Sequence, residues 1–214
     1  DAMTGLAMVY ADVGNTKAAT DLLRQVAEKN PSLRTLTTLA ASYEQIREYG
    51  LAAETLRRTM QVAPGNIDLK KQYAQDLLLS DQFDEALKTF EQLAAEDPKD
   101  PTAYLRMSLI YRQQKNLAKA REAAEKAKQI DPNNLEIRFN DVETLQAEGK
   151  LNEAIAAVKD LLTSTAKRTY NQSERQNRMM LLERLALLYQ KNENMPEAVA
   201  TLRQLPEVDP EIQL

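Results

Sequence analysis

Apolar side chains recur at helical spacing along most of the chain, in short segments that polar turns interrupt. The stretch from Pro101 to Asn134 shows the pattern most completely, because it holds two such segments followed by Asp131-Pro132. The positions that share a face are Tyr104, Met107, Ser108 and Tyr111 in the first segment, and Leu117, Ala120, Ala124, Ala127 and Ile130 in the second. Steps of three and four residues place side chains on one side of an α-helix, and a proline stops the helix before it. The stretch therefore predicts two amphipathic helices.

The same pattern returns along the chain at intervals of about 34 residues. Further prolines follow the apolar segments at Pro31, Pro64, Pro98 and Pro210. Twelve residues before each proline stands an alanine, at Ala19, Ala52, Ala86, Ala120 and Ala198, and Ala154 fills this slot where the proline is missing. A small side chain there lets two helices approach closely. We therefore expect a single array of six helix-turn-helix units at 1–32, 33–66, 67–100, 101–134, 135–166 and 179–210, with an insertion at 167–178.

The sequence also predicts where the turn inside each unit lies. The second helices are expected to begin at Thr16, Tyr49, Phe83, Leu117, Leu151 and Met195. Turn-forming residues lie just before or at these positions, for example Gly14-Asn15 and, in the second unit, Glu48-Tyr49-Gly50. Short polar connections of this kind join antiparallel helices.

These positions resemble the tetratricopeptide repeat, which has a 34-residue period with aromatic, small and proline positions. In the central unit Tyr104 stands at the first aromatic position, Met107-Ser108 replaces a Leu-Gly pair, and Ala124 replaces a Phe. The resemblance implies an all-α fold, an alpha-alpha superhelix whose first helices line a concave face. It also implies a protein-protein interaction scaffold that binds a peptide or helix of a partner protein in the concave groove.

Ten residues of the stripe that would line this groove form the candidate peptide-binding site. They are Lys71, Gln75, Leu78, Leu79, Leu105, Leu109, Arg112, Phe139, Glu143 and Gln146. The apolar members come from three consecutive units and are flanked by charged ones, and an exposed apolar patch with a charged rim typically marks a binding site. The other interpretation is that tight curvature buries the leucines against neighbouring helices.

One subclass of the family grips the C-terminal carboxylate of chaperones with a Lys-x-x-x-Asn pair, a further Asn and a Lys-x-x-x-Arg pair. In this chain Gln75 follows Lys71 at the first spacing, and Arg106 occupies the position of the next Asn. Glu136 and Asn140 replace the last basic pair. An acidic chaperone tail is therefore not the expected partner.

The fifth unit and the insertion depart from the pattern. Arg138 and Asp141 occupy positions that usually face the core, and we expect them to pair with each other on one helix, with a ligand contact as the alternative. The insertion carries Ser173-Glu174-Arg175-Gln176, which we interpret as a capping box that starts the next helix early. Residues 167–191 hold six basic and two acidic side chains, a net charge of +4. A solvated longer helix and a patch for an acidic partner both fit these charges.

The last unit ends irregularly. Pro206 is expected to end or kink its second helix. The residues after Pro210 are too few for the polar helix that caps a repeat array, so we expect an exposed apolar face around Leu202, Leu205 and Val208. Since the chain also begins at Asp1, we interpret it as a segment of a longer protein, with possible self-association through uncapped ends.

The amino-acid composition and the net charge argue against several classes of function. The 214 residues contain no His and no Cys, so the commonest general base, metal ligand and thiol nucleophile are missing; we expect no catalysis, no cofactor and no metal site. A net charge of −4 argues against nucleic acid, which requires a basic face, and no apolar run is long enough for membrane insertion. The expected partner is another protein or peptide. The sequence of this soluble chain does not identify its compartment, and the cytoplasm and the periplasm both stay open. A structural or assembly spacer, or a regulatory segment of a larger multidomain protein, is the alternative function.

Overall fold

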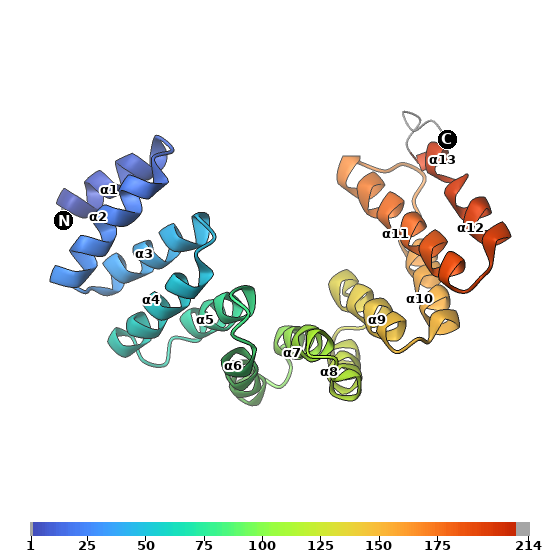
Figure 1. Cartoon of the computed structure of the whole chain (residues 1–214), viewed down its shortest axis with the longest axis horizontal. Helices are drawn as coiled ribbons and strands as arrows, with labels where there is room; N and C mark the ends of the chain where they lie inside the picture. Colours follow the sequence, from blue (N-terminus) through green and yellow to red (C-terminus); the bar gives the residue numbers. More distant parts are fainter. Residues whose placement is uncertain (1, 209–214) are drawn as a thin grey trace. The chain divides into compact units, whose positions relative to one another are not determined.

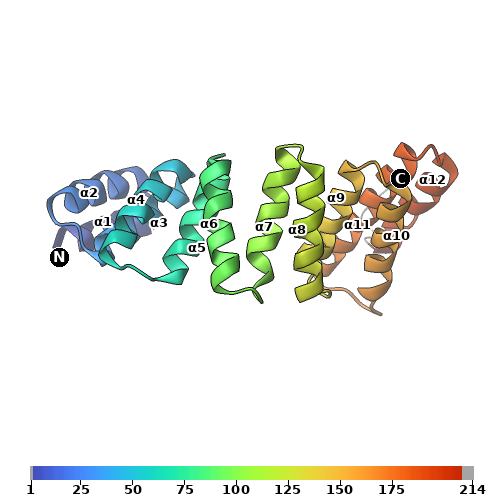
Figure 2. The same ribbon diagram turned by 90° about the horizontal axis from the view of Figure 1, so that it is seen from below.

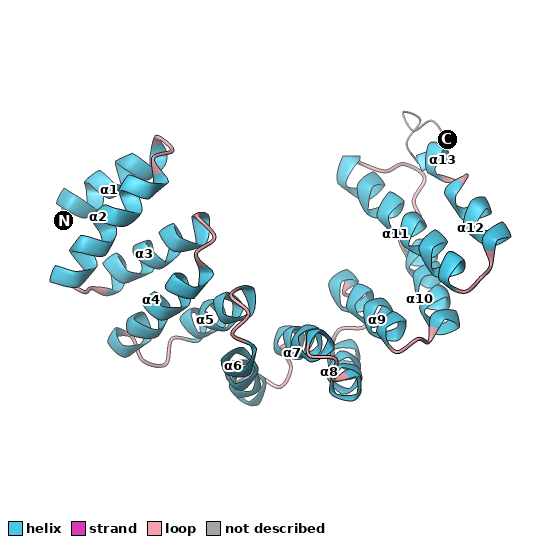
Figure 3. Cartoon of the chain, in the orientation of Figure 1, coloured by secondary structure: helices cyan, strands magenta, loops and turns pink. Residues whose placement is uncertain are grey.

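The computed structural model describes residues 2–208, except the side chains of Ala2, Thr4 and Met8, and every regular element in that range is an α-helix (Figures 1 and 3). Twelve helices form six consecutive hairpins: α1 (Ala2–Asp12) and α2 (Thr16–Lys29), α3 (Leu33–Gln45) and α4 (Tyr49–Val62), α5 (Ile67–Leu79) and α6 (Phe83–Glu96), α7 (Pro101–Gln113) and α8 (Leu117–Ile130), α9 (Leu135–Ala147) and α10 (Leu151–Ser164), α11 (Gln172–Lys191) and α12 (Met195–Leu202). A short helix, α13 (Leu205–Val208), follows. The predicted all-α fold of six hairpins is confirmed, while the predicted helix stop at Pro210 lies outside the described residues.

The turn inside each hairpin is the same structure repeated six times. All six second helices begin at the residue that the sequence predicts. One residue of each turn has a left-handed backbone, with φ between 56° and 80°, at Gly14, Arg47, Asp81, Lys115, Gly149 and Glu193. The amide of the next residue then donates to a carbonyl five positions back, as from Asn116 N to Tyr111 O at 2.8 Å, which is a helix-ending pattern of the Schellman type. The prediction that Gly50 is a turn residue is wrong, because Gly50 lies inside α4 and Arg47 holds the left-handed position.

The alanine that repeats along the chain lies where the two helices of a hairpin cross. Ala19, Ala52, Ala86, Ala120 and Ala154 are fully buried and Ala198 almost so. In the fourth hairpin, whose helices lie side by side in Figure 2, the Ser108 hydroxyl donates to the Ala120 carbonyl at 2.9 Å. Such a bond from α7 to the backbone of α8 requires the close approach that a small side chain permits.

Enlarging the buried alanine should therefore destabilise the protein far more than enlarging an exposed neighbour. We expect Ala120→Leu to lower the free energy of unfolding by about 1 to 3 kcal/mol, the usual cost of overpacking a core. Ala118 is exposed on the same helix, so Ala118→Leu should change stability little. Urea midpoints of the two variants measure the difference, and equal midpoints would mean that the repeat register is wrong.

The helices divide into two compact units, residues 1–99 and 100–214, called here the N-terminal and C-terminal units. The prediction of a single continuous array stays a prediction. In the N-terminal unit a hydrophobic cluster joins the first four helices through Ala7, Leu23, Ala27, Leu36, Leu39, Tyr43 and Ala52. A buried hydrogen bond at 3.0 Å between the hydroxyls of Thr20 and Ser42 links α2 to α3.

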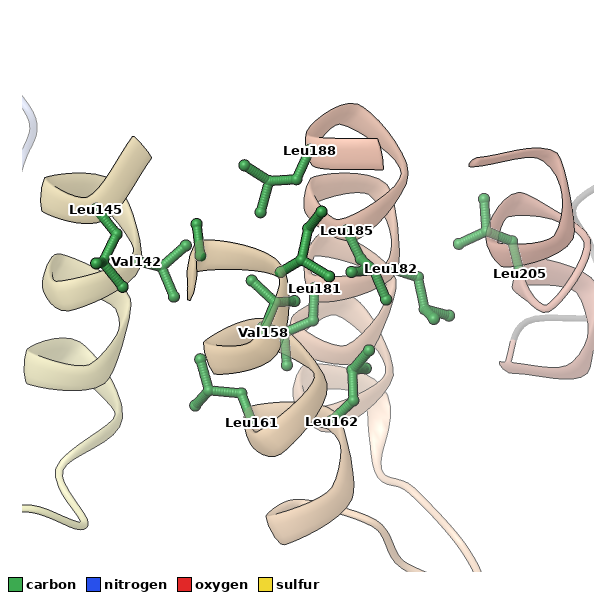
Figure 4. Close-up of a cluster of buried hydrophobic side chains, with 12 residues drawn as sticks. Val142, Leu145, Val158, Leu161, Leu162, Leu181, Leu182, Leu185, Leu188 and Leu205 are labelled. Atoms are coloured by element: carbon green, nitrogen blue, oxygen red, sulfur yellow. The ribbon is translucent and has the colours of Figure 1, made fainter. Parts of the chain in front are cut away.

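The core of the C-terminal unit is built around α11. Figure 4 shows valine and leucine side chains of α9 and α10 meeting Leu181, Leu182, Leu185 and Leu188 of α11. Leu205 of α13 belongs to the same cluster, and Leu202 and Val208 pack against it. The prediction that these three residues form an exposed apolar face is therefore wrong for Leu205, which is buried, and overstated for the other two, which are half-buried.

Pro206 explains this arrangement. The ring of a proline clashes with the carbonyl four residues earlier and cannot donate to it, and that residue is Leu202, where α12 ends. The break was predicted. Its consequence was not: the chain re-forms a helical turn that contacts α11 and carries Leu205 into the core.

Candidate binding site

The candidate residues in the N-terminal unit all lie on α5. Lys71 and Leu79 are exposed, the latter by 47%, and Gln75 and Leu78 are half-buried. They share one face of this helix, as predicted.

A pair of carboxyl groups lies beside them. Asp76 is 97% buried, with only 3% of its surface exposed, and its Oδ2 atom has no hydrogen-bond partner among the described residues. Burial is the main cause that raises the pKa of Asp76 to about 7, and the neighbouring carboxylate of Glu44 adds to it. Burial also raises the pKa of Glu44. Because a buried like-charged pair favours the neutral form, this pair holds a proton near neutral pH.

In the C-terminal unit, one of the predicted contact residues belongs to the core. Leu105 is 3% exposed and packs with Ala127 and Ile137, so the interpretation that curvature buries the leucines is correct for this position. Leu109 on α7 and Phe139 on α9 are half-buried. They still present part of their surface to a partner.

The predicted polar contacts are tied into networks between helices. Arg112 donates to Asn140 Oδ1 at 2.8 Å, and Asn140 in turn donates to Ser108 Oγ at 2.9 Å. Burial lowers the pKa of Arg112, and the nearby Glu143 partly opposes this. Glu143 and Gln146 both contact Arg184 of α11, at 2.5 and 3.2 Å. These contacts place α7, α9 and α11 side by side.

Arg138 and Asp141 do not pair with each other, so the predicted contact between them is wrong. Arg138 bonds to Asp160 at 2.6 Å and to Ser164 at 2.7 Å on α10. Asp141 is buried and accepts from Arg121 at 2.9 Å and from Lys128 at 2.8 Å on α8. Both side chains therefore hold neighbouring helices together, which leaves a ligand contact without support.

A pocket of about 620 Å³ lies between α9, the α10–α11 connection and the start of α11. Phe139 and Met180 line it from the helices, and Lys167, Tyr170, Asn177 and Arg178 line it from the insertion. Met180 is 51% exposed. The insertion thus adds a wall to a face that the ordinary repeat leaves open, and we call the space the insertion pocket.

Internal contacts fix the insertion in this position. The Lys167 amide donates to the Tyr170 hydroxyl at 2.9 Å, and Lys167 Nζ pairs with Glu174 at 2.6 Å. The Arg178 guanidinium lies 5.3 Å from the centre of the Tyr170 ring and donates to the Leu162 carbonyl at 2.9 Å. Such a set of contacts gives the pocket a wall that exists before any partner binds.

The helix start that shapes this wall lies two residues before the predicted one. Asn171 caps α11, and its side chain and that of Glu174 form a reciprocal capping box, at 2.9 and 3.0 Å. The prediction that Ser173 is the cap is wrong, because Ser173 already lies in the helix. Early initiation of the helix is confirmed.

Among residues 2–208, no group of three or more acidic side chains is arranged to hold a metal ion. No helix in that range combines the length and the apolar character that crossing a bilayer needs.

Repeated hairpins, an alanine at each crossing and a left-handed residue in each turn define a helical-repeat protein. The family model described as "Tetratricopeptide repeat" matches residues 74–134, and the hairpins on either side have the same structure. Residues 74–134 therefore belong to the tetratricopeptide repeats, and the remaining described hairpins share the fold of that family.

Solved structures share the fold. A tetratricopeptide repeat protein from Parabacteroides merdae is 17% identical, with a TM-score of 0.73 over 95% of this chain and 77% of that one. Pseudomonas aeruginosa pilF is 22% identical, with a TM-score of 0.62 over 99% and 92% of the two chains. A thermophilic protein of the family from Thermus thermophilus is 18% identical, with a TM-score of 0.59 over 84% and 93%. At these identities the likeness concerns the fold alone.

A curated relative is much longer than this chain. Human protein O-mannosyl-transferase TMTC1 is 27% identical over 131 residues, which are 61% of this chain. The matched region is 15% of that protein. The similarity therefore concerns a minor part of the relative.

Proposed function

We propose that this protein is a scaffold that binds a peptide or helix of a partner protein in the groove lined by its first helices, and that the C-terminal unit is the main contact. The observation that carries the proposal is the row of apolar side chains left accessible on α7, α9 and α11. These are Leu109, Phe139, Met180 and Leu187, called here the first-helix face. Lys71, Gln75, Leu78 and Leu79 of the N-terminal unit remain predicted contacts.

Packing supports this interpretation. The helices that carry the first-helix face are held by Arg112–Asn140 and by Arg184–Glu143, so a partner meets a surface ordered in advance. Pre-organisation lowers the entropic cost of binding, and an amphipathic helix or extended segment uses a row of apolar anchors in a groove. Binding, and not catalysis, is the role that these side chains fit.

Leu109→Glu should weaken partner binding by about 2 kcal/mol, the size of an interface hot spot. The measurement uses random 12-residue peptides displayed on phage, selected against the wild-type chain and then titrated by fluorescence anisotropy. Lys88→Glu, at an exposed position of α6, is the control and should bind as the wild type does.

Because Leu109 is half-buried, its substitution can also unfold the unit. Leu187 is 40% exposed, and Leu187→Glu therefore repeats the test without that risk. Wild-type affinity in folded samples of both variants would show that the first-helix face is not the binding surface.

The second candidate function is a structural or regulatory segment within a larger protein. Its specific support is the human relative, of which the matching region is a small part. An array of peptides tiled along the natural full-length chain separates the two functions. Binding to peptides of the chain itself, sensitive to Leu187→Glu, would favour the intramolecular role.

A further inference from the structure

We propose that the insertion pocket is a specificity site that receives large apolar side chains of a partner segment carrying an acidic residue beside them. The proposal rests on the proposed function and adds the place and the chemistry of recognition. The site is particular to this chain, because residues 167–178, where the repeat pattern is interrupted, supply one wall of the pocket.

The volume and lining of the pocket fit side chains of a peptide. About 620 Å³ lies within the range of roughly 300 to 1,000 Å³ that is usual for ligand-binding pockets. Phe139 and Met180 belong to both the pocket and the first-helix face. An extended or helical segment lying on that face would therefore direct a neighbouring apolar side chain into the pocket.

The charge around the pocket indicates which residue of the partner should lie beside the apolar anchor. Both carboxylates in the lining already have cationic partners: Glu136 pairs with Arg106 at 2.6 Å, and Glu174 pairs with Lys167 at 2.6 Å. Arg178 forms no ion pair with any carboxylate among residues 2–208, since it donates to a carbonyl and lies over Tyr170. The surrounding segment, residues 167–191, carries a net charge of +4 in a chain whose total is −4. An Asp or Glu next to the apolar anchor complements this charge.

The test uses the 12-residue phage-displayed peptides, selected on the wild-type chain, and one synthetic peptide that represents the selected sequences. We expect large apolar residues with Asp or Glu close by to dominate the selection. Asn177→Trp, which adds a bulky ring to the lining, should weaken the synthetic peptide at least about 30-fold, as the loss of a hot spot does. Gln176→Trp is the matched control, because Gln176 is the exposed neighbour on α11 and does not line the pocket. It should stay within about threefold of the wild type.

A second variant tests the charge. Arg178→Met keeps an apolar stem near Tyr170 and should weaken the peptide about tenfold at low salt, with less weakening at high salt because ions screen the interaction. Lys159→Met removes one positive charge at an exposed position of α10 and should have little effect. Thermal unfolding of each variant confirms that it is folded.

The outcomes separate the two proposals. Peptides that lose binding with Leu187→Glu but not with Asn177→Trp overturn the pocket and leave the scaffold function standing. Peptides that respond to Asn177→Trp but lack acidic residues, or bind equally to Arg178→Met, overturn the stated chemistry. Failure to select any peptide sensitive to these substitutions overturns both.

Discussion

Raising the pH from 5 to 8 should destabilise the N-terminal unit by about 2 to 3 kcal/mol, because Asp76 must lose its proton inside the protein. Its pKa is raised to about 7 by burial and by Glu44, while an unfolded Asp titrates near 3.9. The folded state therefore binds more protons between these values, and stability falls as the pH rises through about 7. Urea midpoints at the two pH values measure the change.

Among the described residues, Glu44 is the other carboxyl whose pKa is raised by burial, and it belongs to the same pair as Asp76. The chain has no His, and carboxyls whose pKa is lowered, such as Glu148 beside Arg121, change the stability only at more acidic pH. Asp76→Asn should remove most of the pH dependence and stabilise the unit at pH 8, because the amide needs no proton to remain neutral. Glu91→Gln, at an exposed position of α6, should keep the wild-type dependence. A pH slope that survives in Asp76→Asn would rule out this carboxyl as its source.

Leu188→Ala should destabilise the C-terminal unit by about 2 to 5 kcal/mol, the usual range for truncating a buried leucine. Leu188 is fully buried in the cluster that joins α9, α10 and α11 (Figure 4). The loss combines the transfer energy of the removed atoms with the cavity they leave. The midpoint of urea unfolding, followed by circular dichroism, reports it.

The adjacent residue is the matched control. Leu187 is 40% exposed, so Leu187→Ala should cost far less stability than Leu188→Ala, while Leu187→Glu should weaken the selected peptides. Comparable destabilisation by the two alanine substitutions would contradict the orientation of α11. Adjacent positions on one helix thus separate the residues of the core from those proposed for binding.

Local signals made most of the helix boundaries predictable. The turn at Lys115-Asn116 and the alanine at Ala120 recur in every unit and depend on neighbours within a few residues. The start of α11 was misplaced although its signal was present, since Asn171 and Glu174 have the spacing of a capping box. Asn171 and Ser173 are both residue types that cap helices, and the sequence alone did not show which of them caps α11.

Contacts between distant residues were not predictable in the same way. The expected pairing of Arg138 with Asp141 used their spacing on one helix, but Asp141 is buried and takes Arg121 and Lys128 from the preceding helix. Leu105 was expected on the surface because its position was inferred from helical periodicity alone. That periodicity does not show how closely the next hairpin packs against the helix. The insertion was visible as a break in the period, but the positions of Tyr170 and Arg178 depend on their contact with each other, which no periodicity encodes.

The most direct test of the account is hydrogen–deuterium exchange of the whole chain with and without a saturating selected peptide. If the peptide occupies the insertion pocket, amide exchange should slow in residues 165–181 and at the start of α9, with little change in α1–α4. Protection confined to the N-terminal unit, or none around residues 165–181, would contradict the claim that the C-terminal unit recognises the partner through the insertion pocket.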